Sequence, residues 1–470
     1  MKKIYSIAFV AVLGGFLFGY DTAVISGAVE SLNRYFIVPM GLPEKAANAL
    51  LGFIVACALI GCVIGSTLGG YFSRKFGRKR SLLMAALLFL VSSLGSAIPE
   101  MGIIPSGGKA VMFSFIIFRM MGGTGIGLAS VLSPMYIAEV SPAGIRGRLV
   151  SWNQLAVTLG ILIVYIVNYR IALAGDEAWD TVTGWRWMFA SMAFPAFLFF
   201  VLLWFVPESP RWLALSGKKE KALDILSRLN GQEGAKKEFD EIKSSLEHHH
   251  SGKLLSFGKK VLIIGILLSV FQQLTGIQVM MYYAPEIIRN MGSNADSSMF
   301  RAILVGAVNV LFTIIAIYTV DRAGRKPLLL AGSALMTVFM FILGFAFFTN
   351  HMGIVSLIAV LGFVAAFAFS WGPVTWVLLS EIFPNAIRGK AMAVAVAVQW
   401  IMNYVASSTF PLLDRNAWLV EKFNHSLSFW IFGSMALLSF IFVWKMVPET
   451  KGKTLEQMEE TWKTNLLENE

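Results

Sequence analysis

Apolar stretches of about twenty residues recur from one end of this chain to the other, with short charged segments between them. Each stretch is long enough to span a membrane, because a helix needs about 20 apolar residues to cross a bilayer. Of the 470 residues, 56% are hydrophobic and only 14% are charged, far from the balance of a soluble domain. The expected spans are 6–28, 48–72, 80–98, 111–138, 148–173, 185–206, 260–289, 299–320, 327–348, 353–381, 389–412 and 427–447. The sequence therefore predicts an all-α membrane protein with twelve transmembrane helices.

The basic residues lie in short clusters between the predicted spans and give the chain a net charge of +11. They do not follow one face of a helix, which argues against a nucleic-acid partner. The clusters fall in every second loop, and the positive-inside rule places such loops in the cytoplasm. Lys2 and Lys3 place the N-terminus there, and an even number of spans places the C-terminus there too. The loop that holds Asp176 and Glu177 is expected to face outward.

The basic start of the chain, followed by an apolar run, resembles a secretory signal peptide. The run from Ile4 to about Ala28 is too long for the core of a signal peptide, and it contains Asp21. We therefore predict that this segment is kept as the first span.

From Pro207 to about Lys260 the composition becomes polar and charged, with helix-forming stretches at 218–229 and 236–246. We predict an intracellular helical linker. Three consecutive histidines at 248–250 lie in this segment, but no neighbouring residue completes a metal site. A solvated loop is the interpretation that we favour for them.

The two cysteines, Cys57 and Cys62, fall within one apolar run and are predicted to be packing residues. The sequence contains no Walker lysine motif, phosphate-binding glycine loop, zinc-protease motif or nucleophile elbow. We therefore expect no enzymatic activity, no cofactor and no bound metal.

Three short motifs occur twice, in the same order. They are Gly-Arg-Lys at 77–79 and 324–326, Glu with Arg at 139 and 146 and at 381 and 388, and Pro-Glu at 207–208 and 448–449. The offsets between the copies are 324 − 77 = 247, 381 − 139 = 242 and 448 − 207 = 241 residues. Because the offset is nearly constant, the chain is predicted to consist of two six-span halves in parallel orientation.

Several motifs of this chain resemble those of the major facilitator superfamily, and specifically its sugar porter branch. The resemblance covers nearly the whole chain. The shared motifs are the two Gly-Arg-Lys copies, Pro-Glu-Ser-Pro-Arg at 207–211, Gln-Gln-Leu-Thr-Gly at 272–276 and Pro-Glu-Thr-Lys-Gly at 448–452. The segments 18–27, 371–381 and 382–391 are similar to bacterial D-xylose:proton symporters.

The resemblance implies the major facilitator fold, in which two pseudo-symmetric six-helix bundles give a sugar near mid-membrane alternating access to the two sides. The expected parts are an N-terminal six-helix bundle at 1–206, the intracellular linker at 207–259, a C-terminal six-helix bundle at 260–447 and a cytoplasmic tail at 448–470.

Amide side chains occur inside several predicted spans, where an unsatisfied polar group is costly. They are Gln154, Gln272, Gln273, Gln278, Asn309, Gln399 and Asn403. They could form hydrogen bonds between helices, worth roughly 1 kcal/mol per pair. They could also line a cavity for an uncharged sugar, because a carboxamide donates and accepts as sugar hydroxyls do. The resemblance implies sugar contacts for Gln154, Gln272, Gln273, Gln278, Tyr282, Asn309, Trp376, Gln399 and Trp400.

Aromatic faces suit the C–H faces of a pyranose, although tryptophan in a membrane protein is more often an interfacial anchor. Trp376 is the better ligand candidate, because the adjacent Gly372 and Pro373 break the tenth span. Two positions depart from the family pattern: Gln278 stands where Asn is usual, and Ile161 where close xylose symporters tend to carry Gln. D-xylose is therefore the first choice of substrate and not a deduction.

Asp21 and Arg119 are the clear charges deep within the predicted spans, where a charge costs several kcal/mol unless it is paired or solvated. We predict that they face each other. They could form a static ion pair, or Asp21 could bind and release a proton when the pair separates and re-forms. Relatives that only facilitate diffusion tend to lack this acid, so its presence favours symport. Some symporters carry a second acid on the sixth span, where this chain has Met192, so coupling would depend on Asp21 alone.

Charged residues repeat at the ends of the spans that are predicted to be cytoplasmic. They are Arg78, Glu139, Arg146, Glu208, Arg325, Glu381, Arg388 and Glu449. We expect salt bridges between the bundles that close the inner side and break when the bundles rock. Orientation by positive charge alone would explain the arginines but not the repeated glutamates.

The sequence and the resemblance together favour a proton-coupled symporter that imports a monosaccharide, D-xylose first, through a bacterial inner membrane. A uniporter, or a symporter for glucose, galactose or arabinose, is the alternative. A non-transporting sugar sensor is a third hypothesis, which the short tail of about twenty residues after Pro448 disfavours. The expected partners are a monosaccharide, the proton and the lipid bilayer, with no nucleic acid, and the expected functional unit is a monomer.

Overall fold

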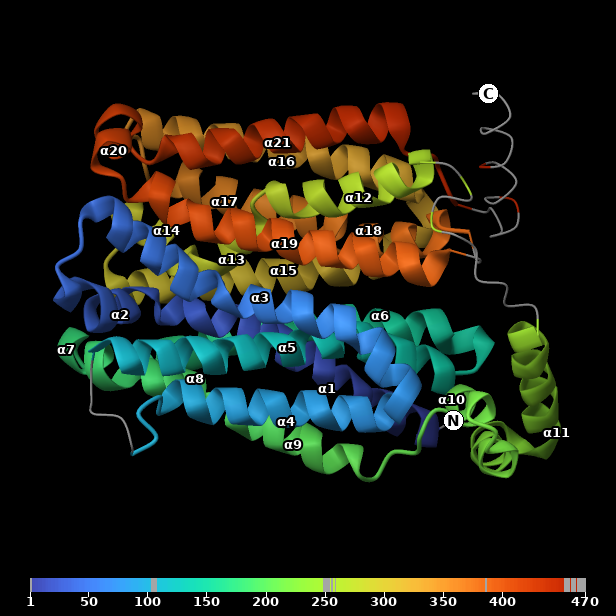
Figure 1. The fold of residues 1–470 in the computed structure, drawn as a ribbon. Helices are drawn as coiled ribbons and strands as arrows, with labels where there is room; N and C mark the ends of the chain where they lie inside the picture. Colours follow the sequence, from blue (N-terminus) through green and yellow to red (C-terminus); the bar gives the residue numbers. More distant parts are fainter. Residues whose placement is uncertain are drawn as a thin grey trace.

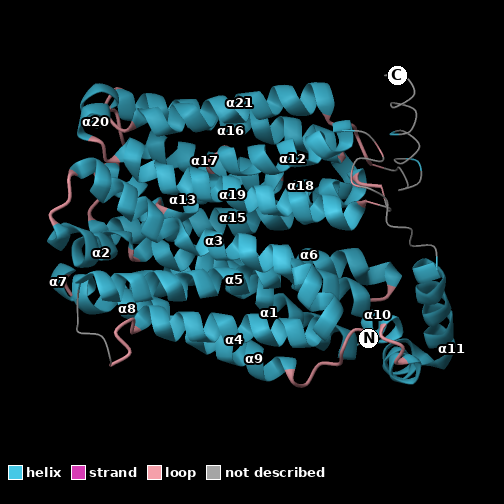
Figure 2. Cartoon of the chain, in the orientation of Figure 1, coloured by secondary structure: helices cyan, strands magenta, loops and turns pink. Residues whose placement is uncertain are grey.

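The computed structural model describes residues 2–102, 108–247, 254, 257, 259–384, 387–451, 457 and 462. Within these residues every regular element is a helix, as Figure 2 shows. Twelve of the described helical segments are long and apolar enough to cross a membrane. The predicted all-α architecture with twelve spans is therefore confirmed.

The first half of the chain forms the N-terminal bundle, drawn from blue to green in Figure 1. Its elements are α1 (Lys2–Val24), η1 (Ile25–Gly27), α2 (Val29–Leu32), η2 (Asn33–Ile37), η3 (Val38–Met40), α3 (Glu44–Phe76), α4 (Arg78–Ala97), α5 (Gly108–Val140), α6 (Ala143–Ala172), α7 (Glu177–Trp179), η4 (Asp180–Gly184), α8 (Trp185–Ser191) and α9 (Ala193–Leu203). In its interior α5 packs against α1, α3 and α4, and α1 also packs against α6.

The second half forms the C-terminal bundle, drawn from yellow to red in Figure 1. Its elements are α12 (Lys259–Leu274), α13 (Ile277–Tyr282), α14 (Ala284–Asn290), α15 (Ala295–Ala323), α16 (Arg325–Phe348), α17 (Ile354–Phe369), α18 (Trp371–Ile382), α19 (Arg388–Asp414), α20 (Ala417–Phe423) and α21 (Ser426–Met446). The two bundles meet where α3 packs against α19 and where α6 packs against α15.

The linker between the bundles is helical, as predicted, and consists of α10 (Pro210–Leu215) and α11 (Lys219–Glu247). Gly231, with φ 78° and ψ 170°, interrupts α11 between the two stretches that the sequence indicates. Trp212, Leu226 and Phe239 form a small apolar core that holds α10 against α11. The histidines at 248–250 lie outside the described residues.

The two ends of the molecule differ in what they carry (Figure 1). The linker helices and the N-terminus lie at one end, which we call the linker end. The short elements α2, α7, α14 and α20 lie at the opposite end, which we call the distal end.

The first span is longer than predicted and runs from Ile4 to Met40 instead of ending near residue 28. Glu30 and Arg34 are charged, which makes this segment resemble a loop in the sequence. In the structure they lie four residues apart on the helical path and form an ion pair, with Nε 3.0 Å from Oε1. The helical turns therefore continue past α1 to the distal end, because Glu30 and Arg34 neutralise each other there.

Small residues allow α3 and α5 to approach closely at the centre of the N-terminal bundle. A Cβ atom on Gly123 would lie 1.7 Å from the carbonyl oxygen of Ala58, and one on Gly65 would lie 2.2 Å from that of Thr124. Any larger residue would force the helices apart, as is typical of helix contacts inside membranes. This packing holds α5 where it can present Arg119 to α1.

Candidate functional site

A cavity of about 70 Å³ lies between the two bundles. Its wall is built by α1 and α6 from the N-terminal bundle and by α12, α13, α15, α17, α18 and α19 from the C-terminal bundle. Of the residues expected to contact a ligand, the cavity is lined by Gln154, Gln272, Gln273, Gln278, Asn309, Trp376, Gln399 and Trp400. Six of the seven amides singled out in the sequence are thus brought together from both halves of the chain, and Asn403 is not on the cavity wall.

The glutamines of the seventh span reach the cavity because the helix is interrupted between them. Gln272 and Gln273 lie in the last turn of α12, which ends at Leu274, and Gln278 lies in the first turn of α13. Gly276 between them has φ +91°, a left-handed conformation that favours glycine. The break thus redirects the backbone between the two ends of this span.

The tenth span is broken as well, at Ser370, which has φ −126° and ψ −90°. The sequence places this break at Gly372 and Pro373, two to three residues later. In the structure Pro373 lies in the first turn of α18, where its missing N–H removes no helical hydrogen bond. The shift leaves Trp376 one turn into α18, on the cavity wall.

The amides around the cavity do not all have the same role. The Gln272 side chain donates from Nε2 to the carbonyl oxygen of Trp371, at 3.0 Å, and so ties α12 to α18. Its Oε1 in turn accepts from Nε2 of Gln273, at 3.4 Å. Gln272 therefore forms a hydrogen bond between helices. This is one of the two roles that the sequence leaves open for these amides.

Four buried polar atoms on the cavity wall have no hydrogen-bond partner within the described part of the chain. They are Oε1 of Gln273, Oε1 of Gln278, Oε1 of Gln399 and Nε1 of Trp400. A buried polar group without a partner costs about 1–3 kcal/mol, so native structures rarely contain several together. Three acceptors and one donor around one cavity match a ligand with several hydroxyl groups, each of which can donate and accept.

Tyr282 is the one expected contact residue that does not line the cavity. It is the last residue of α13 and is only 4% exposed. The likeness to the family did not reveal this, because the direction of a side chain at a helix end depends on the helix that packs against it. Its neighbour Tyr283 is also buried and donates to the carbonyl oxygen of Ser407, at 3.1 Å.

Asp21 of α1 and Arg119 of α5 face each other, as predicted. Nη1 of Arg119 lies 2.5 Å from Oδ1 of Asp21, and Arg119 and Asp21 are 2% and 0% exposed. Among the described residues, the second carboxylate oxygen of Asp21 has no hydrogen-bond partner, nor has Nε of Arg119. The guanidinium also lies 5.2 Å from the centre of the Phe189 ring.

The ion pair is close to the cavity along α1. Phe18 lines the cavity and Asp21 follows it three residues later, a rise of about 4.5 Å along a helix. A movement of α1 that follows ligand binding would therefore also move Asp21 relative to Arg119. Met192 of the sixth span is fully buried.

The charged motifs of the N-terminal half form one network at the linker end. Arg78 donates from Nε and Nη2 to the two carboxylate oxygens of Glu139, at 2.8 and 2.7 Å. The backbone N–H groups of Arg78 and Lys79, at the start of α4, donate to Glu208 at 2.9 and 3.0 Å. The hydroxyl of Ser209 donates to Glu139. Glu208 thus caps α4 where the helix dipole favours a negative charge.

The C-terminal half repeats this network. Arg325 donates from Nε and Nη2 to Glu381, at 3.1 and 2.9 Å. The backbone N–H groups of Arg325 and Lys326 donate to Glu449, at 3.0 and 2.9 Å, and Thr450 donates to Glu381 at 2.6 Å. Burial raises the pKa of Glu449, but the backbone N–H groups around it outweigh this effect and hold its pKa below the ordinary value.

For the two arginine–glutamate pairs, these contacts differ from the predicted salt bridges between the bundles, because each pair lies inside one bundle. Arg78 and Glu139 both belong to the N-terminal bundle, and Arg325 and Glu381 both belong to the C-terminal bundle. Arg388 donates from Nε to the carbonyl oxygen of Phe383, at 3.2 Å. The side chain of Arg146 lies outside the described residues. Each copy of the repeated motifs contains both the arginine and the glutamate, so each ion pair forms within its own bundle.

Charges that join the bundles lie at the distal end, and they were not predicted from the sequence. Glu30 contacts Arg289 and Arg415, two residues of the other bundle. The spacing of Glu30 and Arg34 was the available signal, since such a pair favours a helix that continues past residue 28. No pattern in the sequence indicates which distant charge lies opposite.

Comparison with known proteins places these features in context. The sequence family described as "Sugar (and other) transporter" matches residues 7–462. The chain is 56% identical to the D-xylose-proton symporter of Escherichia coli, over 98% of this chain and 96% of that protein. It is 39% identical to the glucose facilitated diffusion protein of Zymomonas mobilis, over 97% of each.

Among solved structures, the fold is similar to the inward-open conformation of the xylose transporter XylE from Escherichia coli, with a TM-score of 0.88 and 54% identity. The match covers 98% of this chain and 100% of that chain.

Proposed function

Because the chain belongs to the sugar (and other) transporter family, we propose that it carries a monosaccharide across a membrane together with a proton. The fold is that of the major facilitator superfamily, and the protein crosses the membrane several times. Alternating access is the mechanism that we propose, with D-xylose as the first candidate substrate.

The observation that carries this proposal is the group of unpartnered amide oxygens on a cavity wall built by both bundles. Gln273, Gln278 and Gln399 each leave a buried acceptor without a partner among the described residues. Their side chains are neutral, so they suit an uncharged polyol better than an ion. The relative that is 56% identical is named as a D-xylose symporter, which makes D-xylose the first sugar to test.

Coupling to the proton is assigned to Asp21. Its carboxylate is buried, it shares one oxygen with Arg119, and it lies one helical turn from the cavity. A buried carboxylate that loses its arginine favours the protonated form, and one that regains the arginine favours release. We propose that rocking of the bundles alternates between these two arrangements.

The proposal also covers the membrane in which the protein lies, its orientation and its oligomeric state. The similarity to a bacterial transporter favours a bacterial inner membrane, and the basic clusters favour an orientation with the linker end and both termini in the cytoplasm. The cavity lies within one chain, which supports a functional monomer. The division into 1–206, 207–259, 260–447 and 448–470 is part of the same proposal and agrees with the helix ends to within a few residues, since α9 ends at Leu203, α12 begins at Lys259 and α21 ends at Met446.

The test is transport by the purified protein in proteoliposomes. Counterflow with labelled D-xylose, and separately with glucose, galactose and arabinose, identifies the sugar. An inward proton gradient should drive accumulation of the substrate, and Asp21→Asn should abolish accumulation while it retains counterflow. Accumulation by Asp21→Asn at the rate of the unaltered protein would contradict the assignment of the proton site.

The cavity itself is tested by a substitution that keeps the shape and removes the acceptor. Gln399→Leu should weaken sugar binding about 5-fold, because one hydrogen bond is worth about 1 kcal/mol and about 1.4 kcal/mol corresponds to tenfold. Gln232→Leu, in the exposed linker helix α11, serves as the matched control. Equal affinity in both variants would show that the cavity is not the sugar site.

Uniport is the second candidate, since the Asp21–Arg119 pair is directly bonded and could be static. The relative that is 39% identical is named as a facilitated diffusion protein. Equal uptake with and without a proton gradient, and unchanged uptake in Asp21→Asn, would favour this candidate.

A further inference from the structure

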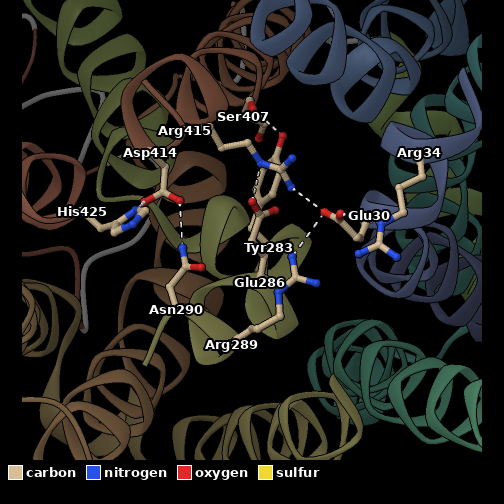
Figure 3. Close-up of polar contacts among 10 residues, drawn as sticks. All are labelled: Glu30, Arg34, Tyr283, Glu286, Arg289, Asn290, Ser407, Asp414, Arg415 and His425. Carbon is tan, nitrogen blue, oxygen red and sulfur yellow. Dashed lines mark hydrogen bonds and ion pairs between the residues drawn. The ribbon is translucent and has the colours of Figure 1, made fainter. Parts of the chain in front are cut away.

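At the distal end, one carboxylate of the N-terminal bundle lies among positive charges of the C-terminal bundle. Oε2 of Glu30 lies 3.3 Å from Nη2 of Arg289 in α14 and 3.1 Å from Nη2 of Arg415, which follows α19. Figure 3 shows both contacts, with Glu30 approaching from the opposite side to the two arginines. These ion pairs cross from one bundle to the other.

Of the two arginines of the C-terminal bundle, Arg415 lies closer to Glu30, and it is anchored in its own bundle. Nε of Arg415 donates to Oε1 of Glu286 at 2.6 Å, and the Glu286 side chain is only 8% exposed. Next to it, the carboxylate of Asp414 accepts from Nδ2 of Asn290 at 3.1 Å and lies 3.2 Å from Nδ1 of His425. In the C-terminal bundle, Glu286 thus holds Arg415 in place, and Glu30 approaches this arginine from the other bundle (Figure 3).

A second contact between the bundles lies at the same end. The backbone N–H of Ala417, at the start of α20, donates to Oε1 of Glu44 at the start of α3, at 2.6 Å. Glu44 also lies in the N-terminal bundle. Two carboxylates of one bundle therefore contact the segment 415–417 of the other, which ties the distal ends of α3 and α19 together.

Because positive charges surround Glu30, its removal should weaken the contact between the two bundles. Arg34, from the N-terminal bundle, also contacts Glu30, so three guanidinium groups surround one carboxylate. Without that carboxylate, Arg34 would face Arg289 and Arg415 across the bundle boundary with like charge. The loss of Glu30 would thus replace attraction between the bundles by repulsion.

We propose that Glu30 holds the distal ends of the bundles together through Arg289 and Arg415, and so sets the fraction of molecules in which that end is open. The two arginine side chains are 35% and 19% exposed and Glu30 is 30% exposed. Ion pairs of this exposure are individually weak and can break during each cycle of a two-state protein. The proposal rests on the alternating opening that is part of the proposed function.

The experiment measures the distance between the bundles at the distal end. Spin labels are placed on Ala49→Cys of α3 and Glu421→Cys of α20, both exposed, with Cys57 and Cys62 replaced by alanine. Pulsed double electron–electron resonance on the full chain in lipid nanodiscs, without sugar, gives the populations of short and long distances. The unaltered ion pairs should give mostly the short distance.

Glu30→Gln should raise the long-distance fraction about 3- to 10-fold, the range expected from losing weak ion pairs and gaining repulsion. The matched control is Glu177→Gln, at the same end, because Glu177 pairs with Arg34 within the N-terminal bundle. Its distance distribution should stay that of the unaltered protein. Equal distributions for Glu30→Gln and the unaltered protein, or equal shifts for both variants, would overturn the proposal.

Arg289→Gln provides an independent variant, since its contact with Glu30 also crosses the bundles. It should shift the distances in the same direction, and adding it to Glu30→Gln should bring no further opening, because it also removes one of the charges that would repel Arg34. Fully additive shifts would mean that the two residues act separately, which contradicts the proposal. The measurement needs neither sugar nor a proton gradient, so its failure and a failure of transport are distinguishable.

Discussion

The charges at the two ends of this protein are arranged in opposite ways. At the linker end, Arg78 pairs with Glu139 and Arg325 pairs with Glu381, so each of these ion pairs stays within one bundle. At the distal end, Glu30 pairs with arginines of the other bundle. The first arrangement holds each bundle rigid, and the second holds the bundles against each other.

The internal repeat explains the difference. A duplicated motif carries both of its partners with it, so each copy closes its network inside its own bundle. Glu30 has no acidic counterpart in the second half, where the offsets of 241–247 residues lead to the uncharged residues 271–277. Contacts between the bundles are thus made by residues that the repeat does not duplicate.

The two copies of the linker-end network differ in burial, and the largest predicted effect follows from this. The side chains of Arg78 and Glu139 are each 8% exposed, whereas those of Arg325 and Glu381 are 11% and 27% exposed. Arg78→Gln leaves a buried carboxylate unpaired and should destabilise the protein by about 3–5 kcal/mol. Arg325→Gln should cost less, about 1–3 kcal/mol.

Thermal unfolding of both variants in detergent checks this order, with Arg78→Gln giving the larger drop in Tm. Equal drops would mean that burial does not distinguish the two copies.

A smaller effect is expected at the glycines that precede α4 and α16. A Cβ atom on Gly77 would lie 2.4 Å from Oε2 of Glu208, and the residue has φ +93°. Gly77→Ala should therefore displace the cap of α4 and strain the backbone, for a total of about 2–3 kcal/mol. Gly324→Ala, where the Cβ would lie 2.8 Å from Glu449, should cost less.

Gly389→Ala is the control for these substitutions, because no atom of the described residues lies within 4 Å of its Cβ position. Its Tm should equal that of the unaltered protein. A loss of stability in Gly389→Ala as large as in Gly77→Ala would rule out displacement of the cap as the cause.

The salt concentration should affect the ion pairs at the distal end more than those at the linker end. The Debye length falls from about 10 Å at 0.1 M to about 3 Å at 1 M, and exposed ion pairs are screened more than buried ones. Raising the salt concentration over this range should increase the long-distance population of the distal labels about 2- to 3-fold, since the Glu30 pairs are partly exposed. The same labels in Glu30→Gln should respond weakly. An identical response in both proteins would show that the salt acts elsewhere.

The smallest expected effect concerns His425, at the edge of the distal cluster. Burial lowers its pKa, but the hydrogen bond and charge of Asp414 outweigh burial and raise the pKa above its ordinary value of about 6.5. A raised histidine pKa stabilises the folded protein fully below about pH 6.5, and this contribution is lost as the pH rises through the raised pKa.

His425→Gln should therefore lower the stability by about 0.5 kcal/mol at pH 6 and by less at pH 9, measured as Tm in the two buffers. A difference that grows with pH would contradict this sign.

Much of the site was predictable from the sequence, because the relevant signals are local. Amides in apolar spans indicate a polar interior, and Gln273, Gln278 and Gln399 lie on the cavity wall. What the sequence could not separate is the role of adjacent amides. Gln272 donates to a carbonyl of α18, whereas Gln273 leaves its acceptor toward the cavity. That difference arises from a break in another helix.

The sequence by itself determined the number of spans and the two halves, because hydropathy adds up over about 20 neighbouring residues and a repeat is visible as a constant offset. It also determined which residue types face the cavity and that Asp21 needs a buried partner. Only the tertiary structure decided which charges join the bundles. Glu30 and Arg415 are separated by 385 residues, and no local pattern specifies how two rigid bundles are placed against each other.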